Sequence, residues 1–175
     1  MFYMKEQSAS PDLEISSAIT EIVEEAKKRW GLEYEGEIPL KGGIAITTVR
    51  PNDVGHPTSA KDYWELAITT ADTWQNWINT PIDKDAFVLV CGMFNNTVAN
   101  PATNEIQITS NGIALPVINI DHIYSYQEPK MYLSKPIGTG PSATLKIQCT
   151  ARVAQSERIG LIGYTIAKKS FVITQ

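Results

Sequence analysis

The chain has 175 residues, of which 43% are hydrophobic and 19% charged, and its formal net charge is -4. This length suffices for one domain with a full core, and the composition is typical of a globular protein. The largest basic cluster, residues 27–29, is too small to neutralise a row of phosphates, so we do not expect nucleic acid as the main ligand. No apolar run approaches the roughly 20 residues that cross a bilayer, and the apolar start is too short for a signal peptide. We therefore expect neither a membrane span nor secretion by that route.

The first part of the chain predicts a loose arm over residues 1–9 and then one amphipathic helix. Ser10 suits the N-cap, Pro11 the first helical position and Gly31 the residue after the helix. One face of the helix is an apolar stripe, and the opposite face carries oppositely charged pairs four residues apart. The stripe consists of Ile15, Ile19, Ile22, Val23, Ala26 and Trp30. It needs a cover, which is either the chain's own sheet or a neighbouring subunit.

From residue 32 onward the apolar residues recur with a period of two, and Pro, Gly and Asn separate the runs. We therefore divide the chain into an arm and helix over 1–31 and a β-sandwich domain over 32–175. The predicted strands cover residues 44–49, 63–70, 86–94, 105–110, 113–115, 117–126, 130–133, 143–153, 159–167 and 171–174. The unbroken apolar run 86–94 indicates a strand covered on both faces or lying at a subunit contact. Asn111-Gly112 favours a type I′ hairpin turn.

Two segments between the strands predict other local structure. Asp72 is a candidate cap for a short helix that carries Trp74 and Trp77 and ends at Pro81. Residues 155–158 predict a turn.

The clearest strand runs over residues 143–153, where apolar and polar side chains alternate at every position. Its apolar face consists of Ala143, Leu145, Ile147, Cys149, Ala151 and Val153. Since successive strand side chains point to opposite faces, this face requires a second layer. We predict an all-β, antiparallel two-sheet sandwich of jelly-roll or Greek-key type, with the N-terminal amphipathic helix attached.

The sequence contains few candidates for catalytic or metal-ligating residues. The two histidines are His56, in a loop, and His122, which follows Asp121, and no spacing typical of a metal site surrounds either of them. Asp83 and Asp85 precede an apolar strand, where capping the strand start is the commoner role. We therefore predict no catalytic, cofactor-binding or metal residues.

The remaining features are tryptophans and cysteines. Trp64, Trp74 and Trp77 fall within fifteen residues that begin at Tyr63, and such a group either stacks on sugar rings or packs in a core or interface. The cysteines at 91 and 149 lie in apolar runs, which favours small buried hydrophobes over a disulfide. The interface candidates are Ile15, Ile19, Ile22, Val23, Trp30, Trp74 and Trp77.

The stretch Tyr132 to Ile147, YLSKPIGTGPSATLKI, combines an edge-strand run, a Pro/Gly turn and an alternating strand. In this it resembles β-sandwich virion proteins of tailed viruses. The resemblance implies a capsid-associated subunit, such as a head decoration (cement) protein. We therefore expect a non-enzymatic structural protein of the virion that binds copies of itself and other capsid proteins. The alternative expectation is a carbohydrate-binding module that uses exposed tryptophans.

Overall fold

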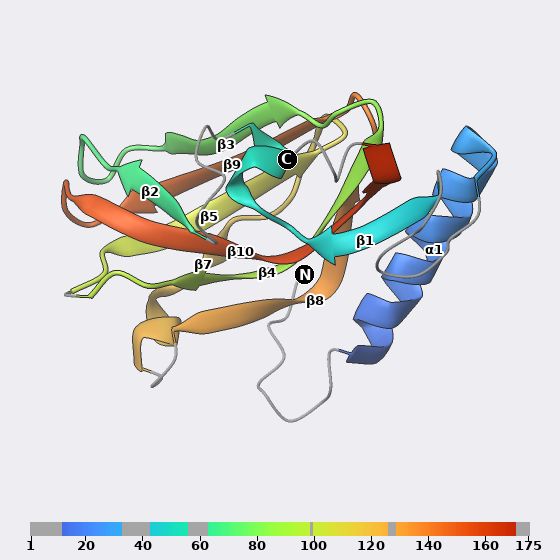
Figure 1. Ribbon diagram of the computed structural model, residues 1–175. Helices are drawn as coiled ribbons and strands as arrows, with labels where there is room; N and C mark the ends of the chain where they lie inside the picture. Colours follow the sequence, from blue (N-terminus) through green and yellow to red (C-terminus); the bar gives the residue numbers. More distant parts are fainter. Residues whose placement is uncertain (1–11, 33–42, 56–62, 99, 126–128, 171–175) are drawn as a thin grey trace.

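The computed structural model describes residues 12–32, 43–55, 63–98, 100–125 and 129–170 and consists mainly of strands (Figure 1). Its elements are helix α1 (Asp12–Trp30), strands β1 (Ile44–Thr48), β2 (Trp64–Ala67), β3 (Gln75–Pro81), β4 (Ala86–Asn95), β5 (Thr103–Ser110), β6 (Ile113–Ala114), β7 (Ile118–Asn119), β8 (Lys130–Thr139), β9 (Thr144–Ala151) and β10 (Ser156–Lys168), and 3-10 helices η1 (Pro51–Val54) and η2 (Asp121–Ser125).

The strands form two antiparallel sheets in which early strands pair with late ones. In sheet A, β1 and β2 both pair with β10, β10 pairs with β4, and β4 pairs with β8; in sheet B the order is β3, β9, β5, β6, with β7 also on β5. The pairs β1/β2 with β10, β3 with β9, β4 with β8, and β5 with β6/β7 are therefore nested, and they alternate between the sheets. This is the rolled hairpin of a jelly roll. The predicted all-β two-sheet sandwich with one N-terminal helix is confirmed.

Strand β4 lies between two apolar clusters, which explains its unbroken apolar sequence. Val88 and Val90 belong to the inner core between the sheets, whereas Phe87 and Leu89 belong to a second cluster on the outer face of sheet A. Nine of the ten β4 side chains are buried. The strand is thus covered on both faces, by sheet B on one side and by α1 on the other.

Helix α1 packs its apolar stripe on the chain's own sheet A. Val23 and Ala26 are buried, and the edge of the Trp30 ring meets Phe87 with 5.5 Å between ring centroids. The backbone N–H of Gly31 donates to Lys27 at 2.8 Å, and Gly31 takes a φ of 63°, which ends the helix as expected for glycine after a helix C-terminus. The proposed caps Ser10 and Pro11 lie outside the described residues. No helix in the described parts is long and apolar enough to cross a membrane.

The alternation predicted for residues 143–153 holds on the apolar face of β9. Leu145, Ile147, Cys149 and Ala151 are all at most 1% exposed, as predicted. On the polar face Thr150 is only 6% exposed, against prediction, and its hydroxyl donates to the Asn104 side chain at 2.7 Å. Beyond the strand the alternation fails. Val153 is 49% exposed, so its predicted place in the core is wrong. The strand ends at Ala151, and the alternation of faces ends with it.

The short helix predicted to end at Pro81 is wrong, because residues 75–81 form strand β3. Asp72 has a φ of 52°, which no helix start adopts, and its backbone N–H donates to Ala151 at 2.9 Å. Residues 75–81 then pair with β9, with a register shift between Asn76 and Ile78. Pairing to a strand that lies far along the chain therefore outweighs the local helix signals.

Other boundaries also differ from prediction, and three of the differences are large or change the type of element. The turn predicted over residues 155–158 is wrong, since β10 begins at Ser156. The strand predicted over 117–126 is only two residues long and is followed by η2. Strand β8 continues to Thr139, six residues beyond its predicted end, because it pairs with β4 on both sides of a bulge. The strand predicted over 171–174 lies outside the described residues.

Candidate functional site

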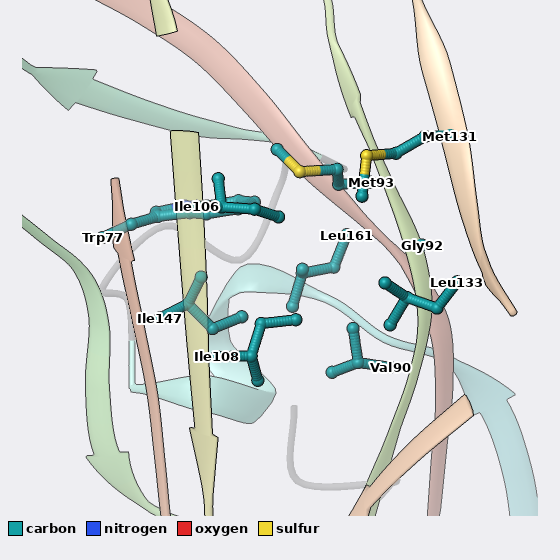
Figure 2. Close-up of a pocket in the computed structure, with 10 residues that line it drawn as sticks. All are labelled: Trp77, Val90, Gly92, Met93, Ile106, Ile108, Met131, Leu133, Ile147 and Leu161. Carbon is teal, nitrogen blue, oxygen red and sulfur yellow. The ribbon is translucent and has the colours of Figure 1, made fainter. Parts of the chain in front are cut away.

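The interior between the sheets is filled by side chains. Figure 2 shows apolar residues from both sheets converging there, including Met93 and Leu161 from sheet A and Ile106 and Ile147 from sheet B. No space for a water molecule remains among the residues that line this region. β-barrels that bind small molecules hold them in an interior cavity or in the mouth of the barrel, and the region between these ten residues offers no such cavity.

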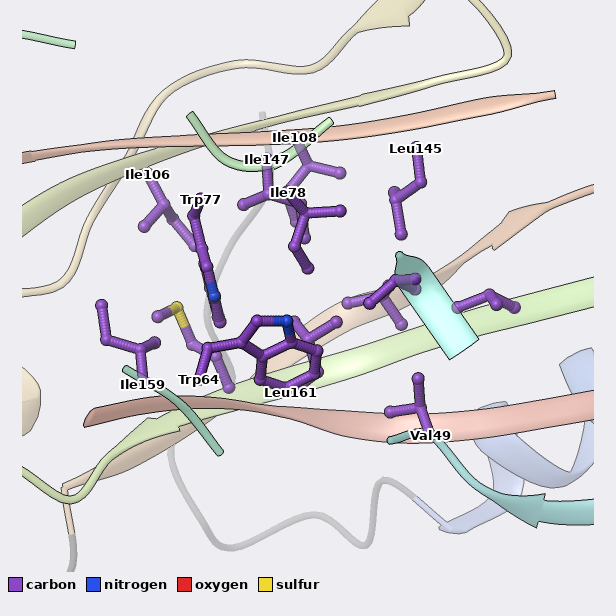
Figure 3. Close-up of a cluster of buried hydrophobic side chains, with 14 of the residues drawn as sticks. Val49, Trp64, Trp77, Ile78, Ile106, Ile108, Leu145, Ile147, Ile159 and Leu161 are labelled. Atoms are coloured by element: carbon purple, nitrogen blue, oxygen red, sulfur yellow. The ribbon is translucent and has the colours of Figure 1, made fainter. Parts of the chain in front are cut away.

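Two of the three clustered tryptophans belong to this core. Trp64 and Trp77 are 1% and 7% exposed, and their rings meet edge to face with centroids 5.7 Å apart (Figure 3). Such aromatic pairs contribute packing energy beyond their buried area. Trp77, which we had singled out as an interface or sugar-binding candidate, is therefore a core residue of the subunit, and only Trp74 is exposed, at 40%.

The other interface candidates lie on α1 and contact sheet A. Val23 is 8% exposed, and Ile15, Ile19, Ile22 and Trp30 are half-buried against the cluster on the outer face of the sheet. The structure thus brings the five helix residues together in one stripe and separates them from Trp74, which lies in the loop before β3.

One end of the sandwich is formed by three loops that hydrogen-bond to one another, and we call it the loop end. It comprises the β2–β3 loop (68–74), the described residues of the β4–β5 loop (96–98 and 100–102) and the β9–β10 loop (152–155), which lie together in Figure 1. The backbone N–H groups of Ile68, Asp72 and Arg152 donate to Gln155, Ala151 and Ala102, each at 2.9 Å.

A buried carboxylate, that of Glu157, accepts hydrogen bonds from residues of the loop end and of the strands next to it. Glu157, on β10, is 0% exposed. It accepts hydrogen bonds from the Gln155 amide at 2.7 Å, the Asn95 amide at 2.8 Å and the Thr103 hydroxyl at 2.5 Å. The backbone N–H groups of Ala102 and Thr103 also donate to it. One side chain therefore ties the start of β10 to the end of β4 and the start of β5.

The hydrogen bonds keep Glu157 ionised. Burial raises the pKa of this carboxyl, but the hydrogen bonds that it accepts outweigh burial and lower the pKa below its usual value. Asn95 also donates to the Tyr124 hydroxyl at 3.1 Å, and that hydroxyl donates to the Thr103 carbonyl at 2.6 Å. The network thus extends from the loop end into η2.

Each loop of the loop end carries an exposed apolar side chain. Trp74 is 40% exposed, Val98 91% and Val153 49%. Around them, Arg152 forms an ion pair with Asp121, and Arg158 lies 3.9 Å from Glu65. The loop end therefore exposes one apolar side chain on each of three hydrogen-bonded loops, with charged pairs nearby. This arrangement can bind another macromolecule, because burial of such side chains is favourable and little ordering of loops is needed.

Glu157 and the two valines were missed by sequence reasoning. The sequence signal for Glu157 was its spacing of two and four residues from Ile159 and Leu161. In a strand this spacing places all three side chains on one face, which here is the core face of β10. No sequence signal marked Val98 and Val153, since their exposure depends on where strands β4 and β9 end.

The residues considered for chemistry have structural partners. The Asp83 carboxylate accepts the backbone N–H of Asp85 at 2.8 Å, and Asp85 pairs with Lys168 at 2.7 Å. Asp121 pairs with Arg152, while His122 is exposed on η2 and His56 lies outside the described residues. Over the described ranges, no three His, Cys, Asp or Glu side chains are grouped as metal ligands.

Both cysteines are free and buried. Burial raises the pKa of each thiol to about 12. They therefore act as small hydrophobic residues of the two cores, as predicted, rather than as nucleophiles.

No family model matches this chain, and no curated protein matches it.

Proposed function

We propose that this chain is a non-enzymatic structural protein of a virus particle, a capsid-associated decoration or minor capsid subunit. In this proposal it binds copies of itself and other capsid proteins through the loop end. The observation that carries the proposal is the set of three exposed apolar side chains, Trp74, Val98 and Val153, on loops that hydrogen bonds hold together.

The fold supports this proposal as an analogy. Jelly rolls are the architecture of many viral capsid proteins, as well as of lectin domains and cupins. The filled interior favours the use of the outer surface, and the run over residues 132–147 resembles virion proteins of tailed viruses.

The energetics of the loop end also support an interface. Apolar side chains held in place before binding lose little conformational entropy on contact, so most of their burial energy is available for affinity. Trp is enriched among the residues that dominate binding energy at protein interfaces. Exposed apolar side chains of this kind are more favourable when a protein partner buries them than when they stay in solvent.

Light scattering on the eluting protein tests the proposal. We expect the parent chain to elute as an oligomer, and the Trp74→Ser/Val98→Ser/Val153→Ser variant to shift toward the monomer mass. The matched control is Leu13→Ser, which removes an 80% exposed apolar side chain from α1, away from the loop end, and leaves the mass unchanged. A parent chain that is monomeric at high concentration and does not bind particles of its source contradicts the proposal.

Exposure of Trp74 supports one alternative, a carbohydrate-binding module. Trp74 has the polar residues Asp72, Thr73 and Asn76 as neighbours in sequence, and sugars are bound by flat rings together with hydrogen-bonding groups. Trp77 takes no part in this alternative, because it is buried. A glycan array on which the parent and Trp74→Ala proteins give the same signals removes it.

A further inference from the structure

A surface groove of about 490 Å³ runs between α1 and β8, away from the loop end. Its apolar base includes Ile22 from the helix, Leu89 from β4 and Gly138 from β8. Gly138 leaves room that the Ile22 side chain occupies, since a Cβ at this position would lie 3.3 Å from Ile22 Cδ1. The rim carries Glu21 and Ser17 on the helix side.

We propose that this groove binds the start of the chain's own N-terminal arm, the apolar segment Phe2-Tyr3-Met4. The groove and the arm adjoin, because the arm joins α1 at Asp12 and the first residue of α1 that lines the groove is Glu14.

The arm is long enough to reach along the groove. The groove follows α1 from Glu14 to Ile22, eight residues and about 12 Å of helix at roughly 1.5 Å per residue. The seven residues between Met4 and Asp12 extend to about 23 Å at roughly 3.3 Å per residue. This length exceeds the run of the groove along α1.

The chemistry of the segment matches the groove. Two aromatic rings and a thioether bury large apolar areas against the apolar base. The next residues are Lys5 and Glu6, and the rim offers Glu21 on the helix and Lys135 on β8 as oppositely charged partners. Apolar and charged positions of the arm therefore both find complementary positions.

The occupant is the chain's own arm and not that of a second copy, because of effective concentration. A short flexible tether holds its end near the groove at roughly millimolar concentration. At micromolar protein, an arm from another molecule is about a thousandfold more dilute. This inference does not depend on the proposed function.

Amide NMR spectra of the full chain and of a variant that lacks residues 2–9 test the proposal. We expect the deletion to shift the resonances of Ala18, Ser134 and Gly138, and the free peptide of residues 1–9, added at millimolar concentration, to restore them. The same peptide with Ser at positions 2, 3 and 4 restores nothing. Resonances of the loop end stay unchanged.

A second variant keeps the arm and blocks the groove. Ser17→Arg places a long side chain at the groove rim, and we expect the resonances of residues 2–6 to move to those of the free peptide. The matched control is Ser16→Arg, at the neighbouring exposed position that does not line the groove, and it leaves the resonances of the arm unchanged. The proposal is overturned if the deletion and Ser17→Arg leave all these resonances in place. It is equally overturned if the deletion variant forms an oligomer with fewer subunits than the full chain, because the arm then occupies a neighbour's groove.

Discussion

Glu157→Gln is the substitution that most sharply tests how the loop end is held. An amide that keeps its oxygen on the side of Asn95 and Thr103 presents its NH₂ group to the Ala102 N–H and the Gln155 amide. Two hydrogen bonds to a charged acceptor are then lost, and donors face donors. At roughly 1.5–3 kcal/mol for each bond to a charged group, the free energy of unfolding falls by about 3–6 kcal/mol.

Urea unfolding at pH 7 measures this change. The matched control is Glu105→Gln, the same substitution on β5 at a half-buried position, where the carboxylate accepts a long hydrogen bond of 3.4 Å from the Thr150 hydroxyl. We expect the control to alter the free energy of unfolding by no more than about 0.5 kcal/mol. Equal midpoints for Glu157→Gln and the parent refute the account of the network.

The pH dependence provides a second test of the same residue. Because the folded-state pKa of Glu157 lies below its unfolded value of roughly 4.3, ionised Glu157 stabilises the fold at pH values above the unfolded pKa. This contribution is lost as the pH falls from there through the folded pKa. The stability gap between the parent and Glu157→Gln should therefore shrink between pH 7 and acid pH. A gap that stays constant contradicts the lowered pKa.

The remaining predictions concern the two cores. Ile147→Ala is expected to lower the free energy of unfolding by about 2–5 kcal/mol through lost burial and a cavity, whereas Gln148→Ala, on the outer face of sheet B, changes it by no more than about 0.5 kcal/mol; denaturant melts compare the two. Ile19→Asp places a carboxylate against the outer cluster and should cost about 2–4 kcal/mol, and an unchanged melting temperature would show that the stripe of α1 is not packed. Cys91 and Cys149 should resist a thiol reagent in the native state and react in urea, and rapid native labelling of either would contradict their burial.

The sequence predicted the fold where a periodic pattern and tertiary burial agree. The alternation through Leu145, Ile147 and Cys149 identified β9. In a sheet with one buried face, a shift of register by one residue would move these apolar side chains to the solvent face. The glycine at 112 marked the hairpin turn between β5 and β6, and it has a φ of 78°. These signals are local, so they can be read without knowing the partner strands.

Features that depend on distant partners were not predictable in this way. Residues 75–81 carry no strong strand pattern and become β3 by pairing with β9, some seventy residues later. The boundary of the apolar face at Val153 follows from where β9 ends, which no residue type marks. The candidate site was the least predictable part, because Trp74, Val98 and Val153 lie at the same end of the sandwich only through the jelly-roll winding of three loops that are far apart in sequence.

Binding to particles of the source tests the central claim most directly. Purified chain is mixed with particles that lack it, the particles are sedimented, and the bound fraction is measured for the parent and for the Trp74→Ser/Val98→Ser/Val153→Ser variant, with Leu13→Ser as the matched control. We predict saturable binding of the parent and the control, and at least a tenfold weaker affinity for the triple variant. Absence of binding by the parent, or equal binding by the folded triple variant, would contradict a capsid-associated role for the loop end.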